Sequence, residues 1–290
     1  MSATALALIL AAAVAHATWN LFSKQAAAAG ASSFVWLMSL TATAAYAPVV
    51  LVSVLADPPR LTALAWVFML GTGLLQAGYF LFLQSGYRLG DLSVVYPVGR
   101  GSGALLAALA GIVLLGEHPG AAGLAGIGLV VAGVLLLGAP AGRGRPAGHP
   151  APRALAFALA TGLFIASYTL WDKYAVSTLR VPPLLQGYAS LPVMALVLAP
   201  FALRQRARTA LVWRSWRRQV AGAAVLSPLA YVLVLIALSF TAVSAVAPAR
   251  EVSVLAGVLL GRRMLGEGQL ARRLTAAGAI AAGIICIAVG

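Results

Sequence analysis

Long apolar stretches, separated by short polar or proline-containing breaks, cover almost the whole chain. A helix needs about 20 apolar residues to cross the roughly 30 Å hydrocarbon core of a bilayer. On that scale the pattern predicts an all-α integral membrane protein of ten transmembrane helices. It lacks the alternating segments of about ten residues that a membrane β-barrel requires. The predicted spans are 3–23, 33–55, 62–84, 92–115, 121–139, 154–172, 183–203, 219–240, 244–264 and 273–289.

The apolar pattern occurs twice, and the two copies share polar residues at matching positions. Residues 17–24 (ATWNLFSK) align without gaps on 166–173 (ASYTLWDK). Residues 100–117 and 250–267 are identical at seven of 18 positions, with Arg at one end and Leu-Gly-Glu at the other. Chance similarity between apolar helices explains shared leucines but not these polar matches. The predicted domains are a five-helix repeat at 1–139, a Pro/Gly/Arg linker at 140–153 and a second repeat at 154–290.

An odd number of helices in each repeat has a topological consequence. The second repeat must enter the membrane from the side opposite to the first, which makes an inverted repeat. In transporters built this way, the substrate site lies at the repeat interface near the membrane midplane. We therefore expect the two repeats to surround a central cavity.

Composition supports a membrane protein and excludes several other classes. The chain is 62% hydrophobic and 9% charged, whereas soluble domains are nearer half apolar and a quarter charged. The formal net charge of +14 does not indicate nucleic-acid binding, because no basic, aromatic-interleaved soluble segment accompanies it. The single cysteine, Cys286, excludes an internal disulfide. Residues 3–17 lack the basic start of a signal peptide, and we expect a retained first helix.

The basic residues are distributed unevenly between the two sides of the membrane. Fifteen lie in loops or helix ends after odd-numbered spans, and three lie on the other side. Because basic residues near span ends favour the cytoplasm, we expect both termini on the periplasmic side of a bacterial-type inner membrane.

At the repeated motifs the chain resembles the EamA branch of the drug/metabolite transporter superfamily. The resemblance covers nearly the whole chain and implies a ten-helix bundle with a central cavity lined by helices 1, 3, 4, 6, 8 and 9. It implies a carrier or exporter of amino acids, other metabolites or drugs. Larger members usually have both termini in the cytoplasm, opposite to the charge bias here. The motifs are Trp19-Asn20…Lys24, Trp171-Asp172-Lys173, Pro97…Leu115-Gly116-Glu117 and Pro248…Leu265-Gly266-Glu267.

Four ionisable residues lie well inside the predicted spans: His16, Arg100, Arg250 and Glu251. A central Arg costs about 2.5–3.5 kcal/mol even on the lenient insertion scale, so it usually faces a partner or a wet cavity. Arg100 and Arg250 are equivalent in the repeats, and Glu251 is the one deep acid we identify. These residues either form a buried cluster that locks helices 4 and 9 together, or their unbalanced positive charge binds an anionic substrate group. We expect Arg100, Arg250 and Glu251 to lie close together.

A second candidate set is aromatic or carries an amide. These side chains suit the wall of a substrate cavity, although Trp and Tyr near span ends also serve as interface anchors. Gln76 and Tyr79 are three residues apart and share a helix face. The set is Trp19, Asn20, Gln76, Tyr79, Tyr96, Tyr168 and Tyr231.

The predicted function is secondary transport, most simply export, of small metabolites with an anionic or carboxylate group by alternating access. The alternative is a lipid-handling membrane protein, such as a flippase or membrane enzyme. The sequence contains no P-loop, HExxH or GxSxG pattern, so we expect no enzyme activity, cofactor or metal. The expected partners are a small-molecule substrate and the lipid bilayer, without nucleic acid, and a monomer is compatible with the sequence.

Overall fold

The computed structural model describes residues 1–89, 92–138, 152–253 and 270–289. Within these ranges the secondary structure is helical, and no strand is present. The elements are α1 (Ala3–Ala56), α2 (Ala63–Leu89), α3 (Leu92–Leu115), α4 (Ala121–Gly138), α5 (Pro152–Lys173), the π-helix η1 (Tyr174–Thr178), α6 (Pro183–Arg204), α7 (Arg206–Phe240), α8 (Val243–Ala249) and α10 (Leu270–Val289).

Seven helical segments within the described part are long and apolar enough to cross a membrane. Two shorter apolar helices, Ala121–Leu136 and Thr275–Val289, match the predicted fifth and tenth spans. The predicted ninth span, 244–264, lies mostly outside the described residues, as does the predicted linker except for its last two residues, which begin α5. The multi-pass helical architecture is confirmed, while the number ten and the opposite orientation of the repeats stay predictions.

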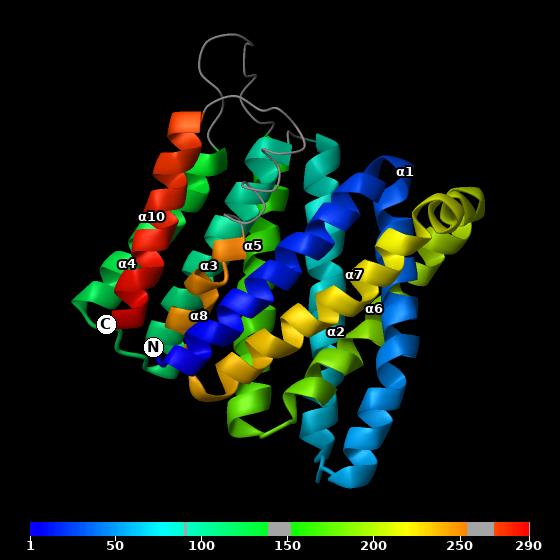
Figure 1. Ribbon diagram of the computed structural model, residues 1–290, viewed down its shortest axis with the longest axis horizontal. Helices are drawn as coiled ribbons and strands as arrows, with labels where there is room; N and C mark the ends of the chain where they lie inside the picture. Colours follow the sequence, from blue (N-terminus) through cyan, green and yellow to red (C-terminus); the bar gives the residue numbers. More distant parts are fainter. Residues whose placement is uncertain (90–91, 139–151, 254–269, 290) are drawn as a thin grey trace. The chain divides into compact units, whose positions relative to one another are not determined.

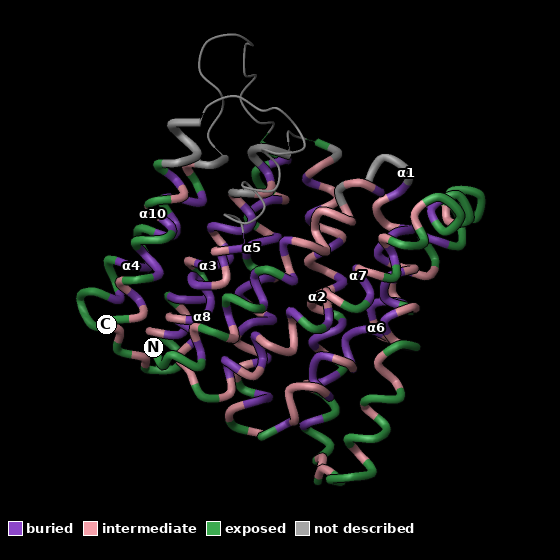
Figure 2. The backbone as a smooth tube through the Cα atoms, viewed as in Figure 1, coloured by how far each residue is buried: buried purple, intermediate pink, exposed green. Residues whose placement is uncertain are grey.

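The candidate spans carry large apolar side chains on their outer surfaces. In the apolar 18-residue stretch of each segment, only 22% to 50% of the residues are buried within the protein. Figure 2 shows buried and exposed residues alternating along α10, as expected for a helix with one packed and one outward face. Leu114 and Leu196 are among the most exposed large residues. A hydrocarbon environment removes the cost of such apolar exposure.

α1 contains two predicted spans, joined at a sharp break. Gly30 has φ 147° and ψ 97° inside an otherwise helical segment, and only glycine adopts such a conformation readily. A Cβ at this position would lie 2.8 Å from the side chain of Arg208. Gly30 therefore combines a backbone conformation with a close contact that a larger residue would disrupt.

The chain divides into two compact units that do not coincide with the two sequence repeats. Unit 1 comprises Met1–Leu10, Gly78–Leu170 and Thr241–Gly290, and unit 2 comprises Ala11–Ala77 and Trp171–Phe240. Each unit therefore contains segments of both repeats. In unit 1, equivalent helices pack on each other: α4 lies beside α10, and α3 contacts α8 (Figure 1).

Small residues let helices of unit 1 approach each other closely. A Cβ at Gly162 of α5 would lie 2.9 Å from the backbone nitrogen of Gly103 in α3. Gly126 of α4 and Gly283 of α10 meet in the same manner, with a Cβ at either lying within 2.7 Å of the other's carbonyl oxygen. Close backbone packing by small residues is typical of membrane helices.

The Leu-Gly-Glu motif at the end of α3 has a defined structural role. Gly116 has φ +65°, the left-handed conformation that ends many helices. The carboxylate of Glu117 then accepts hydrogen bonds from the backbone N–H groups of Val243 (2.6 Å) and Ser244 (2.7 Å). These groups begin α8 and would otherwise have no intrahelical partner. Glu117 therefore caps α8 across 126 residues of sequence.

We expect Glu117→Ala to lower the free energy of unfolding by about 1–3 kcal/mol, because two charge-assisted hydrogen bonds to a helix start are lost. Glu117→Gln keeps one side-chain oxygen and should lose less. Thermal unfolding in detergent can be followed with a thiol-reactive dye at Cys286, the single cysteine. An unchanged midpoint in Glu117→Ala would show that this contact does not stabilise the fold.

Candidate functional site

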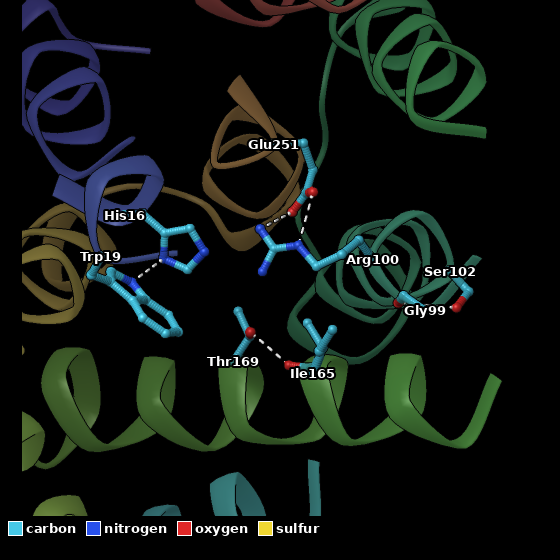
Figure 3. Close-up of polar contacts among 8 residues, drawn as sticks. All are labelled: His16, Trp19, Gly99, Arg100, Ser102, Ile165, Thr169 and Glu251. Carbon is cyan, nitrogen blue, oxygen red and sulfur yellow. Dashed lines mark hydrogen bonds and ion pairs between the residues drawn. The ribbon is translucent and has the colours of Figure 1, made fainter. Parts of the chain in front are cut away.

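The centre of unit 1 contains a buried ion pair between α3 and the residues that follow α8. Arg100 Nη2 lies 2.8 Å from Glu251 Oε1, and Arg100 Nε donates to Glu251 Oε2 at 3.1 Å. Figure 3 shows the two planar groups facing each other in this two-contact arrangement. Both residues are about 95% buried. The predicted contact between Arg100 and Glu251 is confirmed.

The geometry leaves part of the guanidinium group available. A guanidinium carries five N–H donors, and Glu251 accepts from Nε and Nη2. Among the described residues, no acceptor is recorded for the other donors of Arg100. Two polar side chains drawn in Figure 3 bond within their own helices: Ser102 donates to Gly99 O and Thr169 to Ile165 O.

Three of the predicted tyrosines lie around the ion pair. Tyr79 of α2, Tyr96 of α3 and Tyr168 of α5 are all within electrostatic range of Arg100. Tyr79 and Tyr168 also make an edge-to-face contact, with ring centroids 6.2 Å apart. Tyr168 is 6% exposed, so it is not an interface anchor. Five of the site residues predicted from the sequence thus lie together in unit 1: Arg100, Glu251, Tyr79, Tyr96 and Tyr168.

Arg250 is placed differently from its repeat equivalent. It is half-buried, and its backbone N–H donates to Val246 O at the end of α8. Its neighbour Glu251 pairs with Arg100, while no ion pair of Arg250 is recorded among the described residues. The pair formed by Arg100 and Glu251 is neutral, so Arg250 supplies the remaining positive charge of this segment.

The other predicted residues belong to unit 2. Trp19 donates its indole N–H to His16 Nδ1 at 3.2 Å, and the two rings meet edge to face (Figure 3). Asn20 and Gln76 are half-buried. Tyr231 of α7 donates its hydroxyl to the Oδ2 atom of Asp172. A substrate role for Trp19, Asn20 and Gln76 stays a prediction.

The sequence analysis identified Glu251 as the one deep acid, and the structure adds a second acid that is buried within the protein, Asp172. Asp172 is 1% exposed and lies within a continuous apolar helical segment, Pro152–Thr178. The predicted span, 154–172, ended at this residue. The helix instead continues through η1, where Leu179 N bonds to Tyr174 O, and this continuation places Asp172 inside the packed segment. Its partners, Thr72 and Gln186, are isolated polar residues without a motif.

A buried, two-contact Arg–Glu pair ringed by tyrosines is suited to recognition rather than to covalent chemistry. A guanidinium binds carboxylate or phosphate groups through parallel hydrogen bonds. Tyrosine rings supply apolar contact together with a hydroxyl that can donate or accept. A buried ion pair contributes little net stability compared with apolar packing, so stability alone is a weak reason for these residues to be present.

Comparison with known proteins identifies the family. The model of the EamA-like transporter family matches residues 3–139 and 152–289. No curated protein matches the sequence. Twenty-six solved chains are similar. One of them, described only as "Crystal structure of protein", has a TM-score of 0.74 at 19% identity, over 100% of this chain and 98% of that one. This likeness concerns the fold alone. With the two matched repeats and the apolar spans, the chain belongs to the EamA-like transporter family and is a multi-pass membrane transporter of the drug/metabolite type.

Proposed function

We propose that the chain is a secondary transporter that exports small metabolites with an anionic group, such as a carboxylate, across a bacterial-type inner membrane by alternating access. The observation that carries the proposal is the buried Arg100–Glu251 pair with its three tyrosines. Glu251 holds one edge of the guanidinium in place and leaves its other donors to a ligand. Arg250, in the adjacent position, adds the positive charge that Glu251 does not balance.

The proposed substrate contacts divide by chemistry. Arg100 and Arg250 bind the anionic group, and Glu251 orients Arg100. Tyr79, Tyr96 and Tyr168 contact the rest of the substrate. A small metabolite would match a site that combines one charged anchor with apolar and hydroxyl-bearing walls. Family membership supports transport over the alternative of a membrane enzyme, because the family is one of transporters.

We expect purified protein in proteoliposomes to carry labelled carboxylates from a panel of amino acids and mono- and dicarboxylic acids. Each acid is compared with its carboxamide, which has nearly the same shape without the charge. Loss of a charge-assisted contact of about 1.5–3 kcal/mol predicts at least about tenfold slower flux of the carboxamide. Equal flux of both forms would contradict the anionic group, and flux no faster than in protein-free liposomes would contradict transport of the panel.

The direction of transport is tested with the same panel in vesicles of the two orientations. An exporter accumulates substrate in inverted vesicles, whereas an importer accumulates it in right-side-out vesicles. The expected result is accumulation in inverted vesicles when an ion gradient is imposed. Accumulation in right-side-out vesicles alone would show import.

A further inference from the structure

Unit 2 contains a second buried carboxylate, which the anion-binding proposal does not use. Asp172 Oδ1 accepts hydrogen bonds from the hydroxyl of Thr72 (2.6 Å) and from Gln186 Nε2 (3.0 Å). Its Oδ2 accepts one from the hydroxyl of Tyr231. These donors come from α2, α6 and α7, and all three are neutral. Asp172 therefore accepts hydrogen bonds from groups on three helices other than its own.

The side-chain amide of Gln186 has too many acceptors at its nitrogen and no donor at its oxygen. Gln186 is fully buried, and its Nε2 faces three acceptors: Phe68 O at 3.3 Å, Thr72 Oγ1 at 2.7 Å and Asp172 Oδ1 at 3.0 Å. An amide nitrogen has only two hydrogens. Meanwhile its Oε1 has no hydrogen-bond partner among the described residues. A buried unsatisfied acceptor is costly and requires an explanation.

A half-turn of this amide about its last torsion exchanges the nitrogen and oxygen within almost the same volume. The oxygen would then face Thr72, Asp172 and the carbonyl oxygen of Phe68. There it can accept a hydrogen bond from the Thr72 hydroxyl, but beside an ionised Asp172 it would be repelled. Beside a protonated Asp172 it would gain a second donor. The two amide orientations therefore correspond to the two protonation states of the carboxyl group.

We propose that Asp172 is a reversible proton-binding site, and that its protonation drives the transport cycle. A proton from water bonds to a carboxylate oxygen, changing the charge of the side chain from −1 to 0, and later returns to water on the other side. The inference rests on the proposed transporter function. Ionisable residues buried in transmembrane segments commonly mark proton pathways. Glu251 differs, because both of its oxygens contact a guanidinium.

Two titratable side chains from α5 and α7 lie close to Asp172 in sequence or in space. Tyr231 approaches it from α7. Lys173, the next residue in α5, directs its ammonium group to Leu238 O of α7, where it donates at 2.9 Å. The residues that contact Asp172 from α2 and α6, Thr72 and Gln186, do not titrate.

Infrared difference spectroscopy of the whole protein in bilayers, stepped between about pH 4 and pH 9 around the ordinary range of carboxyl groups, tests the site directly. The chain has only six Asp and Glu residues, so single variants assign the carbonyl band of a protonated carboxyl group. We expect a band that is lost in Asp172→Asn and retained in the matched control Glu251→Gln. We also expect the amide bands of Gln186 to change at the same pH and to be absent in Gln186→Leu.

A second variant covers the case in which Asp172→Asn fails to fold. Tyr231→Phe keeps the carboxyl group and removes one hydrogen-bond donor. The band should then persist at a shifted frequency. Absence of a titrating carboxyl band in the native protein would overturn the proposal. A band that survives in Asp172→Asn, or that is unchanged in Tyr231→Phe, would overturn it as well.

Coupling to transport is measured with the carboxylate panel in proteoliposomes that contain a pH-sensitive dye. If one proton moves with each substrate molecule, a pH difference of one unit across the membrane can support up to about a tenfold difference in substrate concentration. We expect proton movement with substrate in the native protein, and no response of the remaining flux to the gradient in Asp172→Asn. Substrate flux without proton movement in the native protein would overturn the coupling. Absence of all flux would count against the proposed transporter, whereas the infrared spectra alone decide the proton site.

Discussion

We expect the replacement of Arg100 with alanine to abolish carboxylate flux while the protein still inserts into the membrane. The change removes the proposed anion-binding group, and it also leaves Glu251 buried without its 2.8 Å partner. Breaking a buried pair from one side costs about 3–5 kcal/mol, because the remaining charge is uncompensated. Both flux and stability should therefore fall in this variant. Flux is measured in proteoliposomes, and stability by the accessibility of Cys286 on heating.

A double variant separates the two effects. Arg100→Gln combined with Glu251→Gln removes both charges and keeps similar side-chain shapes. We expect most of the lost stability to return, because no buried charge is left unpaired. Flux should stay at the level of protein-free liposomes, because no guanidinium is restored. Flux at the native rate in the double variant would show that the pair serves only to pack α3 against the segment after α8.

We expect a reporter fused after Gly290 to show the carboxyl end on the periplasmic side. Alkaline phosphatase there should be active and green fluorescent protein dim, since each works on only one side of the membrane. The expectation follows from the excess of Lys and Arg after odd-numbered spans, because such residues favour the cytoplasm. The fifteen are Lys24, Arg88, Arg143, Arg145, Arg153, Arg204, Arg206, Arg208, Arg214, Arg217, Arg218, Arg262, Arg263, Arg272 and Arg273.

The structure adds a physical reason for this orientation. Residues 204–218 contain six arginines, all exposed, and they lie on both sides of a break in α7 at Trp216, where φ is −127°. Trp213 is exposed in the same segment. Arginine with tryptophan is typical of a membrane interface. Bright fluorescence of the carboxyl-terminal fusion would instead place this arginine-rich segment outside the cytoplasm.

The ion pair could be predicted because the internal repeat drew attention to its arginine. Arg100 and Arg250 occur at equivalent positions, and a buried charge in an apolar span requires a partner, of which Glu251 was the nearest available. The tyrosines followed from the expectation that polar aromatic residues line cavities. Reasoning from periodicity and charge therefore succeeded for residues whose placement depends mainly on one factor, the cost of burying a charge or a polar group in an apolar span.

Asp172 could not be placed by the same reasoning. The polar pair Asp172-Lys173 looks like the end of a span, and nothing in the sequence shows that a π-helix prolongs the segment. Its partners Thr72 and Gln186 are 100 and 14 residues away, and each is an ordinary polar residue within its helix. Contacts of this kind depend on tertiary packing, which local pattern does not encode. The cap formed by Glu117 on α8 was missed for the same reason.

The π-helix also bears on how the two repeats became different in length. Residues 17–24 match 166–173 at a spacing of 149, whereas 100–117 match 250–267 at a spacing of 150. The second copy is therefore one residue longer between these blocks, as a single insertion there would make it. A π turn closes its hydrogen bond over five residues instead of four, as Leu179 N does with Tyr174 O, and so accommodates one added residue without breaking the helix. η1 is a natural place for that insertion, and removing one residue from Tyr174–Thr178 should give an uninterrupted α-helix in which everything after the turn is rotated by about 100°.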